Sequence, residues 1–451
     1  MPNPRPLRSP FRQKRDPRAA LLRSPFRQKR DPRAALPLAV LVTAVGCSPT
    51  APPTDPAPAS TAADPAAAPA ETAPPPFAEV TAESLLAARL PADDHSDGWV
   101  RLFDGHTLMG WESAGDVNWR IEDGAIVAGG VGEEGGDVAL LCTALPWTDY
   151  ELSLQFRATP QTNSGVFLRT KLQVADESRD CYEINIAPPD NPFPTASVVK
   201  RRKKDGVEIT GDWQTMNLVM RNNKVVVSVD GEKVNTYIDP DPIRTGRIGL
   251  QHNTGRIEFR DIRVRPFGLA NLIDDDLTAW KRYDDMDGEF TVNDESLSIR
   301  GGKGQLETRD TFGDFTLLAR YRLARPDTNS GIFFRCIPGD EMMGYECQLN
   351  DAAVDGDPMR PADTGTGGIF RRRPARIIAA DPDTTNTLVL KTHGDTMAAW
   401  VNGLQVSQWT DTRDPDPNPR RGRRDEPGTI ILQAHDPKTD ATLETLGVRR
   451  D

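Results

Sequence analysis

One eight-residue phrase occurs twice in this chain, and the motifs around it repeat in the same order. Residues 162–169 read TNSGVFLR, and residues 328–335 read TNSGIFFR. The offset between the two copies stays close to 170 residues apart from one insertion in the second copy. A fixed period of this size indicates duplication of a whole domain rather than a solenoid of short repeats. Four further motifs occur once in each copy. In the first copy they are Tyr182-Glu183, Lys200-Arg201-Arg202-Lys203, Val229-Asp230-Gly231 and Leu250-Gln251. In the second copy they are, in the same order, Tyr345-Glu346, Arg371-Arg372-Arg373, Val401-Asn402-Gly403 and Leu432-Gln433.

Charge is distributed unevenly along the 451 residues. The formal net charge is −11, but residues 1–36 hold eleven Lys/Arg against only Asp16 and Asp31. The remainder therefore carries 44 basic and 64 acidic residues. A phosphate backbone repels so acidic a surface, and we expect no nucleic-acid partner.

The first 46 residues resemble a bacterial export signal. A basic region precedes the apolar stretch 36–45, which is too short to span a bilayer and has signal-peptide proportions. The ending Ala44-Val45-Gly46-Cys47 resembles a lipobox, which predicts lipidation of Cys47. We expect an exported protein, lipid-anchored at the cell envelope or periplasmic, whose membrane contact is the anchor alone. The phrase LRSPFRQKRDPRAAL occurs at 7–21 and again at 22–36, so this region is itself duplicated.

Composition divides the rest of the chain into a tether and two domains. Residues 48–76 are almost wholly Pro, Ala, Thr, Ser and Asp, which cannot bury apolar surface and predict an extended linker. A short helix is expected within 79–90, so that residues 47–94 form a linker with one helix. The boundary between the two domains falls near Pro266-Phe267-Gly268. We expect the first domain at 95–267 and the second, more divergent, at 268–451.

Strand signals dominate both domains. Runs such as 150–156 and 224–229 alternate apolar and polar residues between Gly, Asn, Asp and Pro clusters. Asp230-Gly231 and Asn402-Gly403 each separate two such runs, as the turn of a two-residue hairpin does. Many short strands with regular turns predict an all-β fold, here two tandem β-sandwiches or jelly rolls.

Four cysteines follow Cys47. An even number in an exported protein permits disulfides, and Cys336 and Cys347 flank one predicted hairpin across which they are able to meet. No CxxC pair and no His/Cys cluster with zinc spacing occurs in the sequence.

Several of these phrases together resemble a known family. Residues 103–108 (FDGHTL) with Gly110-Trp111 are similar to the opening motif of the 3-keto-disaccharide hydrolase-like domains, also described as 3-keto-glucoside 1,2-lyases and 3-keto-2-hydroxy-glucal hydratases. Further similar phrases are Asn163-Ser164-Gly165-Val166-Phe167, Tyr182-Glu183, Asp212-Trp213-Gln214 and residues 259–264 (FRDIRV). The resemblance covers 95–267 well and 268–451 less well. It implies a concanavalin A-like sandwich, in agreement with the strand pattern.

The resemblance also implies a reaction. A ketone at C3 of a glucoside acidifies the hydrogen at C2, so that a base removes it and the aglycone at C1 then leaves; water can add to the product. The sugar itself would be oxidised beforehand by a separate oxidoreductase. The family often ends its last inner strand with Leu-Gln-Asp-His-Gly, whereas this chain reads LQAHD at 432–436 and LQHN at 250–253. No cofactor is required in principle, although the sequence leaves a divalent metal open.

The candidate site follows from strand alternation. If the TNSGxFxR and Tyr-Glu segments lie on neighbouring strands, Arg335 sits opposite Glu346 on one face, and Arg169 sits opposite Glu183. We predict Glu346 or His435 as base and Arg335 as the donor to the enediolate, with Glu183, His252 and Arg169 as their counterparts. The predicted sugar-binding amides are Asn163, Asn185, Gln251, Asn329, Gln348 and Gln433.

Three alternatives stay open at this stage. The Arg/Glu pairs have a purely structural interpretation as cross-strand ion pairs, and the basic runs as solvated loops. The competing function is a lectin-like surface protein that holds carbohydrate and catalyses nothing. In the third alternative, one copy is active and the other is structural. Acid/base-capable residues inside the repeated strands favour the enzyme, and the departures from the family motifs favour the lectin.

Overall fold

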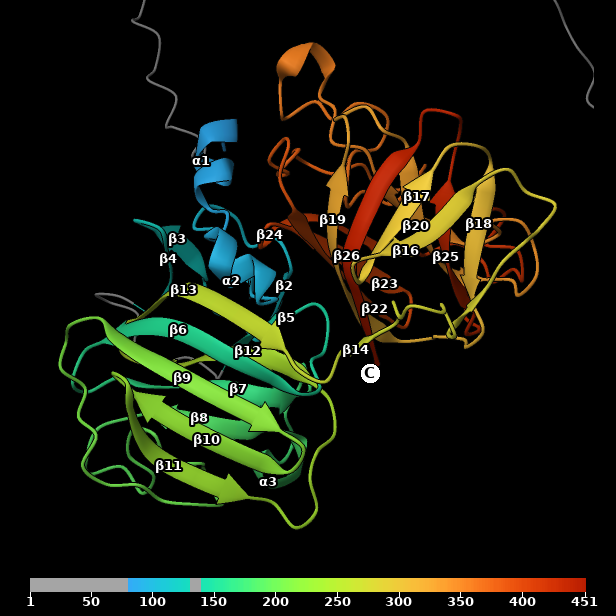
Figure 1. Ribbon diagram of the computed structural model, residues 1–451. Coiled ribbons are helices and arrows are strands. Elements are labelled where there is room, and N and C mark those ends of the chain that lie inside the picture. Colours follow the sequence, from blue (N-terminus) through green and yellow to red (C-terminus); the bar gives the residue numbers. More distant parts are fainter. Residues whose placement is uncertain (1–79, 130–138) are drawn as a thin grey trace, which may run out of the picture. The chain divides into compact units, whose positions relative to one another are not determined.

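The computed structural model describes residues 80–129 and 139–451, and strands make up nearly all of its regular structure (Figure 1). Two units of the same topology follow one another along the chain, each built from an eight-stranded and a five-stranded antiparallel sheet. This confirms the prediction of two tandem β-sandwiches. The expected signal peptide, Cys47 and the Pro/Ala-rich linker lie outside the described residues.

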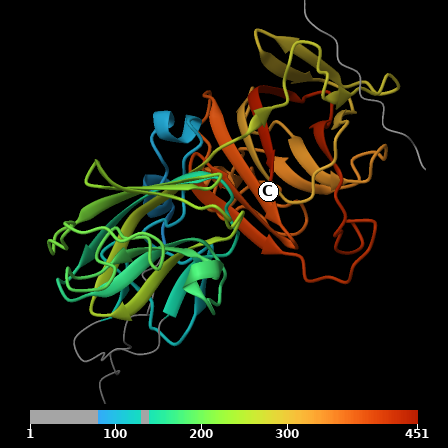
Figure 2. The ribbon, with the colours of Figure 1, turned by 90° about the horizontal axis from the view of Figure 1, so that it is seen from below.

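The first sandwich pairs its sheets in a jelly-roll order. Its larger sheet runs β11-β10-β9-β6-β13-β4-β3 with β1 on β13, and its smaller sheet runs β2-β5-β12-β7-β8. The strands are β1 (Val100–Arg101), β2 (Trp111–Ala114), β3 (Arg120–Glu122), β4 (Ala125–Ala128), β5 (Ala139–Thr143), β6 (Tyr150–Ala158), β7 (Asn163–Thr170), β8 (Tyr182–Ile186), β9 (Gln214–Arg221), β10 (Lys224–Val229), β11 (Glu232–Ile238), β12 (Arg247–Thr254) and β13 (Ile257–Pro266). Figure 2 shows these strands in teal to yellow-green.

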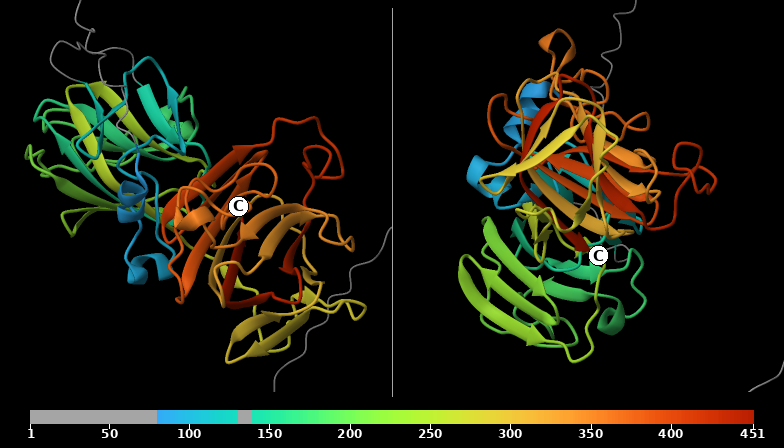
Figure 3. Two further views of the ribbon diagram at one scale, coloured as in Figure 1. Left: turned by 90° about the horizontal axis from the view of Figure 1, so that it is seen from above. Right: turned by 45° about the vertical axis from the view of Figure 1, so that its right-hand side comes forward.

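The second sandwich repeats that order strand for strand. Its larger sheet runs β16-β17-β26-β19-β22-β23-β24 with β14 on β26, and its smaller sheet runs β15-β18-β25-β20-β21. The strands are β14 (Ala270–Asn271), β15 (Trp280–Lys281), β16 (Glu289–Asn293), β17 (Ser296–Arg300), β18 (Gly304–Thr308), β19 (Phe315–Leu323), β20 (Ser330–Cys336), β21 (Tyr345–Leu349), β22 (Asn386–His393), β23 (Thr396–Val401), β24 (Leu404–Thr410), β25 (Thr429–Ala434) and β26 (Asp440–Arg450). Figure 3 shows them in yellow to red.

Alternating side chains build each core. On β6, Tyr150, Leu152, Leu154 and Phe156 are fully buried, and each is separated from the next by a residue that faces away from the core. At roughly 25 cal/mol per Å² of apolar surface removed from water, each such side chain contributes about 2 kcal/mol to folding. Because side chains alternate along a strand, one face of each sheet packs in the core and the residues between point to the opposite face.

Tight turns set the hairpin register, as the sequence predicts. Asp230 and Gly231 connect β10 to β11, and their φ angles are 49° and 81° respectively. Asn402 and Gly403 do the same between β23 and β24, at 48° and 80°. Positive φ at both central residues is the type I′ turn, whose twist matches that of the flanking strands.

Helices are few and short in the part of the chain that the structure describes. They are α1 (Ala82–Ala87), α2 (Ala92–Ser96), α3 (Glu177–Asp180) and a 3-10 turn at Val354–Gly356. The helix expected within 79–90 is α1, which Thr81 caps by accepting a hydrogen bond from the backbone of Ser84 while the Ser84 hydroxyl accepts one from the backbone of Thr81. In the described residues no helix has the length and apolarity needed to cross a membrane.

One backbone irregularity is shared by β7 and β20. The register against β12 shifts near Arg169, and the register against β25 shifts near Arg335. Both arginines have a φ of 48°, in the left-handed region that non-glycine residues seldom adopt. A β-bulge of this kind breaks the period of two and sends the next side chain to the other face of the sheet.

The disulfide across the β20–β21 hairpin does not form. Cys142, Cys181, Cys336 and Cys347 are all buried, free thiols. Cys347 pairs in register with Ile332, and Cys336 pairs with Thr429 on β25. Cys347 belongs to the main core of the second sandwich, whereas Cys336 belongs to a small cluster with Phe333 and Ile431. The two sulfurs thus occupy different layers.

Candidate functional site

The five-stranded sheet of the first sandwich turns one face to the core and the other to a cavity. On β7, Val166 and Leu168 lie in the core, and Phe167 lies in a separate cluster on the opposite face with Leu140. On β8, Tyr182 and Ile184 lie in the core. Since alternate residues share a face, the intervening side chains point to the cavity.

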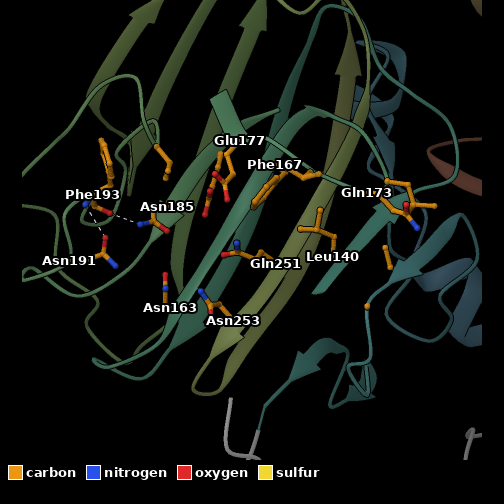
Figure 4. A pocket seen from close by; sticks show the side chains of 16 residues that line it. Leu140, Asn163, Phe167, Gln173, Glu177, Asn185, Asn191, Phe193, Gln251 and Asn253 are labelled. Carbon is orange, nitrogen blue, oxygen red and sulfur yellow. Dashed lines mark hydrogen bonds between the residues drawn. The ribbon is translucent and has the colours of Figure 1, made fainter. Parts of the chain in front are cut away.

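The cavity has a volume of about 450 Å³, which suits a small ligand. Figure 4 shows it lined from β5, β7, β8, β12 and the loops beside them. Its apolar wall contains Phe167, which is buried, and Phe193, which is partly exposed and offers a ring surface of the kind on which sugars pack. The lining residues are Ala114, Gly115, Leu140, Asn163, Phe167, Leu172, Gln173, Val174, Glu177, Glu183, Asn185, Asn191, Phe193, Val199, Gln251 and Asn253.

Glu183 is the titratable group on the floor of this cavity. It is 7% exposed, and burial raises the pKa of its carboxyl to about 7, with the nearby Glu177 adding to the rise. A hydrogen bond from Gln251 and the charge of Lys200 oppose the shift. A carboxyl poised near neutral pH is what general acid–base catalysis requires.

Two amide oxygens beside Glu183 have no partner within the described part of the chain. They are Oδ1 of Asn185 and Oε1 of Gln251, in side chains that are 4% and 6% exposed. The nitrogen of Asn185 is held, because it donates to the carbonyl of Phe193. An orphaned acceptor costs free energy when it is buried, so these oxygens are ready to accept hydrogen bonds from a ligand's hydroxyl groups.

A loop between β7 and β8 forms one rim of the cavity. It contains α3, which Asp176 caps by accepting a hydrogen bond from the backbone of Ser178 at 2.9 Å. Glu177 at the start of α3 pairs with Lys200. Lys200, the first residue of the basic run, is therefore engaged by a carboxylate of the same rim.

The predicted pairing of arginine with glutamate across the strands is wrong. Glu183 lies opposite Phe167, and Glu346 lies opposite Phe333. The bulge turns Arg169 inward, where it is 1% exposed and donates to Asp149 at 2.6 Å and to the carbonyls of Thr148, Asn222 and Ile243.

Arg335 repeats this arrangement in the second sandwich. It is 2% exposed and donates to Asp314 at 3.0 Å and to the carbonyls of Gly313 and Arg424. Strand alternation alone places both guanidinium groups on the cavity face, and the bulge, which leaves no plain mark in the sequence, removes them from it. Neither arginine is available as a donor to an enediolate.

The histidines also lie away from the buried glutamates. His252 follows Gln251 on β12 and so points to the opposite side of the sheet, where its Nε2 lies 2.9 Å from the carbonyl of Gly255. Asn253 lines the first cavity at the next position. His435 lies just beyond β25 with its side chain 44% exposed and Nδ1 3.0 Å from Asp436, outside the set of residues that lines the second cavity.

The second sandwich has a cavity of about 340 Å³ at the matching place. Phe333, Glu346 and Phe370 line it where Phe167, Glu183 and Val199 line the first. Burial raises the pKa of Glu346 to about 8, Asp363 adds to the rise, and Arg420 and Arg371 oppose it. The lining residues are Phe333, Gly344, Tyr345, Glu346, Phe370, Arg371, Arg372, Pro419 and Arg420.

In the second copy the amide nitrogens of Gln348 and Gln433 donate within the protein, and their oxygens have no partner within the described part of the chain, as in the first copy. Gln348 donates to Asn329 at 2.8 Å, and Gln433 donates to the sulfur of Met342 at 3.2 Å. Met342 comes from the β20–β21 loop, whose backbone also donates to Gln305. Asn163, Asn185 and Gln251 line the first cavity, whereas their counterparts do not line the second. The two copies thus differ most in what surrounds an equivalent glutamate.

Sequence reasoning missed Asn253 on β12 and four residues that the loops around β8 bring to the first cavity: Gln173, Glu177, Asn191 and Phe193. The only indication of these residues in the sequence is that they lie on, or in a loop next to, a strand whose alternate residues face the cavity. Among the described residues, no group of three or more His, Cys, Asp and Glu side chains is placed to hold a metal ion.

Comparison with known proteins identifies the two copies. A family model described as a 3-keto-alpha-glucoside-1,2-lyase-like domain matches residues 98–265 and again 268–442. The chain belongs to this family. The resemblance inferred from the repeated motifs is therefore confirmed for both copies.

One curated relative and several solved structures are similar to parts of this chain. A 3-keto-disaccharide hydrolase of Bacteroides thetaiotaomicron is 31% identical over 110 residues, which are 23% of this chain and 37% of that relative. Two putative glycosyl hydrolases of Parabacteroides distasonis are 18% and 24% identical, with TM-scores of 0.34 and 0.30. They cover 40% and 38% of this chain, and 98% and 99% of their own.

Proposed function

We propose that the first sandwich cleaves the glycosidic bond of a 3-keto-glucoside, with Glu183 as the base. The observation that carries the proposal is the Glu183 carboxyl, buried on the floor of a 450 Å³ cavity with a pKa of about 7. Family membership supports the substrate class, and the orphaned amide oxygens of Asn185 and Gln251 support a hydroxyl-rich ligand.

The reaction needs one proton to move twice. Ionised Glu183 removes the hydrogen from C2, and the electron pair of that C–H bond passes into an enolate on the C3 ketone. The enolate then forms the C1–C2 double bond as the C1–O bond breaks. The protonated Glu183 returns the proton to the departing oxygen, so the free aglycone leaves together with a 3-keto-2-hydroxy-glucal.

The chain supplies neutral hydrogen-bonding groups rather than arginine around this carboxyl. Six side-chain amides line the cavity: those of Asn163, Gln173, Asn185, Asn191, Gln251 and Asn253. Amide N–H groups are suited to the ketone oxygen on which the enolate charge develops, and amide oxygens to the ring hydroxyls. Phe193, which is partly exposed, would pack against an apolar face of the sugar.

The test is release of p-nitrophenol from a p-nitrophenyl 3-keto-α-glucoside by the full chain, with the corresponding glucoside that lacks the ketone as a control. We expect release only from the keto sugar. Glu183→Gln should reduce the rate at least 100-fold, since general base catalysis contributes about 10²–10⁴-fold.

Glu346→Gln is the matched control, because it makes the same change at the equivalent position of the second copy. Full activity of Glu183→Gln would overturn the assignment of the base. Binding of the keto sugar without any release of p-nitrophenol would favour the lectin-like alternative for the whole chain.

A further inference from the structure

The two cavities differ in the charged side chains that line them. The first is lined by two carboxyl groups, Glu177 and Glu183, and by no Lys or Arg among the described residues. The second is lined by Arg371, Arg372 and Arg420 around the single carboxyl of Glu346. Duplication gave both sandwiches an equivalent glutamate, so the difference lies in the loops that surround it.

The basic run beside the first cavity is neutralised by carboxylates of its own loops. Lys200 pairs with Glu177, Lys203 pairs with Asp205 at 3.1 Å, and Arg201 lies 3.9 Å from Asp239. A cation that already has a carboxylate partner has little to gain from an anionic ligand. The first cavity is therefore fitted to a neutral sugar.

The arginines of the second cavity lack such partners. In the part of the chain that the structure describes, no ion pair joins Arg371, Arg372 or Arg420 to a carboxylate. Arg371 packs over the ring of Phe370 at 5.1 Å, Arg372 donates to the carbonyl of Arg420 at 3.0 Å, and Arg420 donates to the carbonyl of Met342 at 3.3 Å. Such neutral contacts orient the guanidinium groups and leave their charge uncompensated.

An insertion brings the third arginine to this cavity. In the first copy, β11 is connected to β12 by residues 239–246. In the second copy, the equivalent connection from β24 to β25 is longer and spans residues 411–428. Pro419 and Arg420 lie in the longer connection and line the cavity. Asp411 at its start is paired with Arg413 at 2.7 Å, so that carboxylate is not free to neutralise Arg420.

We propose that the cavity of the second sandwich binds an acidic sugar, whose carboxylate is held by Arg371 and Arg420 and whose ring packs against the partly exposed Phe370. Guanidinium groups match a carboxylate with two parallel N–H donors. A volume of about 340 Å³ accommodates one sugar ring. This site is separate from the one proposed for cleavage, and it requires no turnover.

Glu346 supports an anionic ligand rather than opposing it. Burial raises its pKa to about 8, so at neutral pH the carboxyl is protonated and its O–H can donate to the bound carboxylate. The charged groups that act on it are Asp363, which adds to the rise, and Arg420 and Arg371, which oppose it. Binding should therefore weaken as pH rises through about 8, where Glu346 ionises and repels the ligand.

The experiment is calorimetric titration of the full chain with methyl β-D-glucuronoside, methyl β-D-glucoside and inorganic phosphate at pH 7. We expect the glucuronoside to bind at least 10-fold more tightly than the other two. Arg420→Gln and Arg371→Gln should each weaken it by about 10-fold or more, since hydrogen bonds to charged groups are the stronger class. At pH 9 the glucuronoside should bind more weakly, and Glu346→Gln should remove that pH dependence.

Arg360→Gln is the matched control: it removes the same charge from an exposed arginine of the same sandwich that pairs with Asp355 outside the cavity. It should leave binding unchanged, as should Glu183→Gln in the first cavity. Equal affinity for glucoside and glucuronoside, or unchanged binding by both cavity variants with normal melting temperatures, would overturn the proposal. Phosphate binding as tightly as the glucuronoside would also overturn it, in favour of a plain anion site.

Discussion

Gly165 on β7 lies so close to Glu183 on β8 that a methyl group at Gly165 would stand 3.2 Å from the carboxyl oxygen Oε1. Gly331 stands in the same relation to Glu346, at 2.8 Å. Neither glycine has a positive φ, so the backbone would accept a larger residue. What requires glycine here is the space taken by the buried glutamate, in both copies.

Gly165→Ala should therefore move the glutamate without unfolding the sandwich. A Cβ at 3.2 Å from both Cγ and Oε1 of Glu183 is tighter than ordinary contact, so the carboxyl has to shift. We expect the rate on a 3-keto-glucoside to fall at least 10-fold with a small change in melting temperature. Gly331→Ala, the matched change in the second copy, should leave that rate intact. Equal rates for wild type and Gly165→Ala would contradict the proposed position of the base.

The pKa of Glu183 also sets a pH profile for the proposed cleavage. A base acts only when ionised, and the pKa of this carboxyl is raised to about 7. The value of kcat/KM should therefore rise with pH through about 7 and level off above it, falling about 10-fold per pH unit below. Measurement between pH 5 and pH 9 checks this. A profile that is flat from pH 5 upward would point to a base with an ordinary carboxyl pKa.

The raised pKa of Glu183 also means that this carboxyl destabilises the folded state at pH values above its pKa in the unfolded chain. The folded state holds the proton more tightly than the unfolded chain, whose value is 4.5, so stability falls as pH rises from about 4.5 to about 7 and is constant above that. Glu183→Gln should thus raise the free energy of unfolding at pH 8 by at most about 3 kcal/mol, at 1.4 kcal/mol per pKa unit. At pH 4.5 the variant and wild type should unfold alike. Thermal melts at the two pH values measure the difference.

Arg169 should matter for stability. It is buried and donates to Asp149 and to three backbone carbonyls, so Arg169→Met removes four hydrogen bonds and the cationic partner of Asp149. Breaking a buried ion pair on one side costs about 3–5 kcal/mol. Arg179→Met, at a side chain that is 85% exposed, should cost less than about 1 kcal/mol. Loss of activity in a variant of Arg169 with an unchanged melting temperature would instead indicate a role in the site.

The fold was accessible from the sequence because its determinants are local and repeated. Alternating apolar and polar residues, as in 150–156, predict the strands directly. The turn residues Asp230-Gly231 and Asn402-Gly403 predict the hairpins. The buried glutamates, Asn163, Asn185 and Gln251 were found for the same reason, since each lies on a regular part of a strand. Alternation failed where the backbone departs from it, at the bulges of Arg169 and Arg335, and it carries no information about loops such as 411–428.

The burial of the cysteines gives a final test of the architecture. Burial raises the pKa of the Cys142 and Cys347 thiols to about 12 and moves those of Cys181 and Cys336 upward as well. A thiolate is the reactive form, so none of the four should react with a thiol reagent at pH 8 while the protein is folded. In a Cys47→Ser background, all four should react once urea unfolds the chain, without any reductant. A need for reductant would reveal a disulfide and contradict the separation of Cys336 from Cys347 into different layers of the second sandwich.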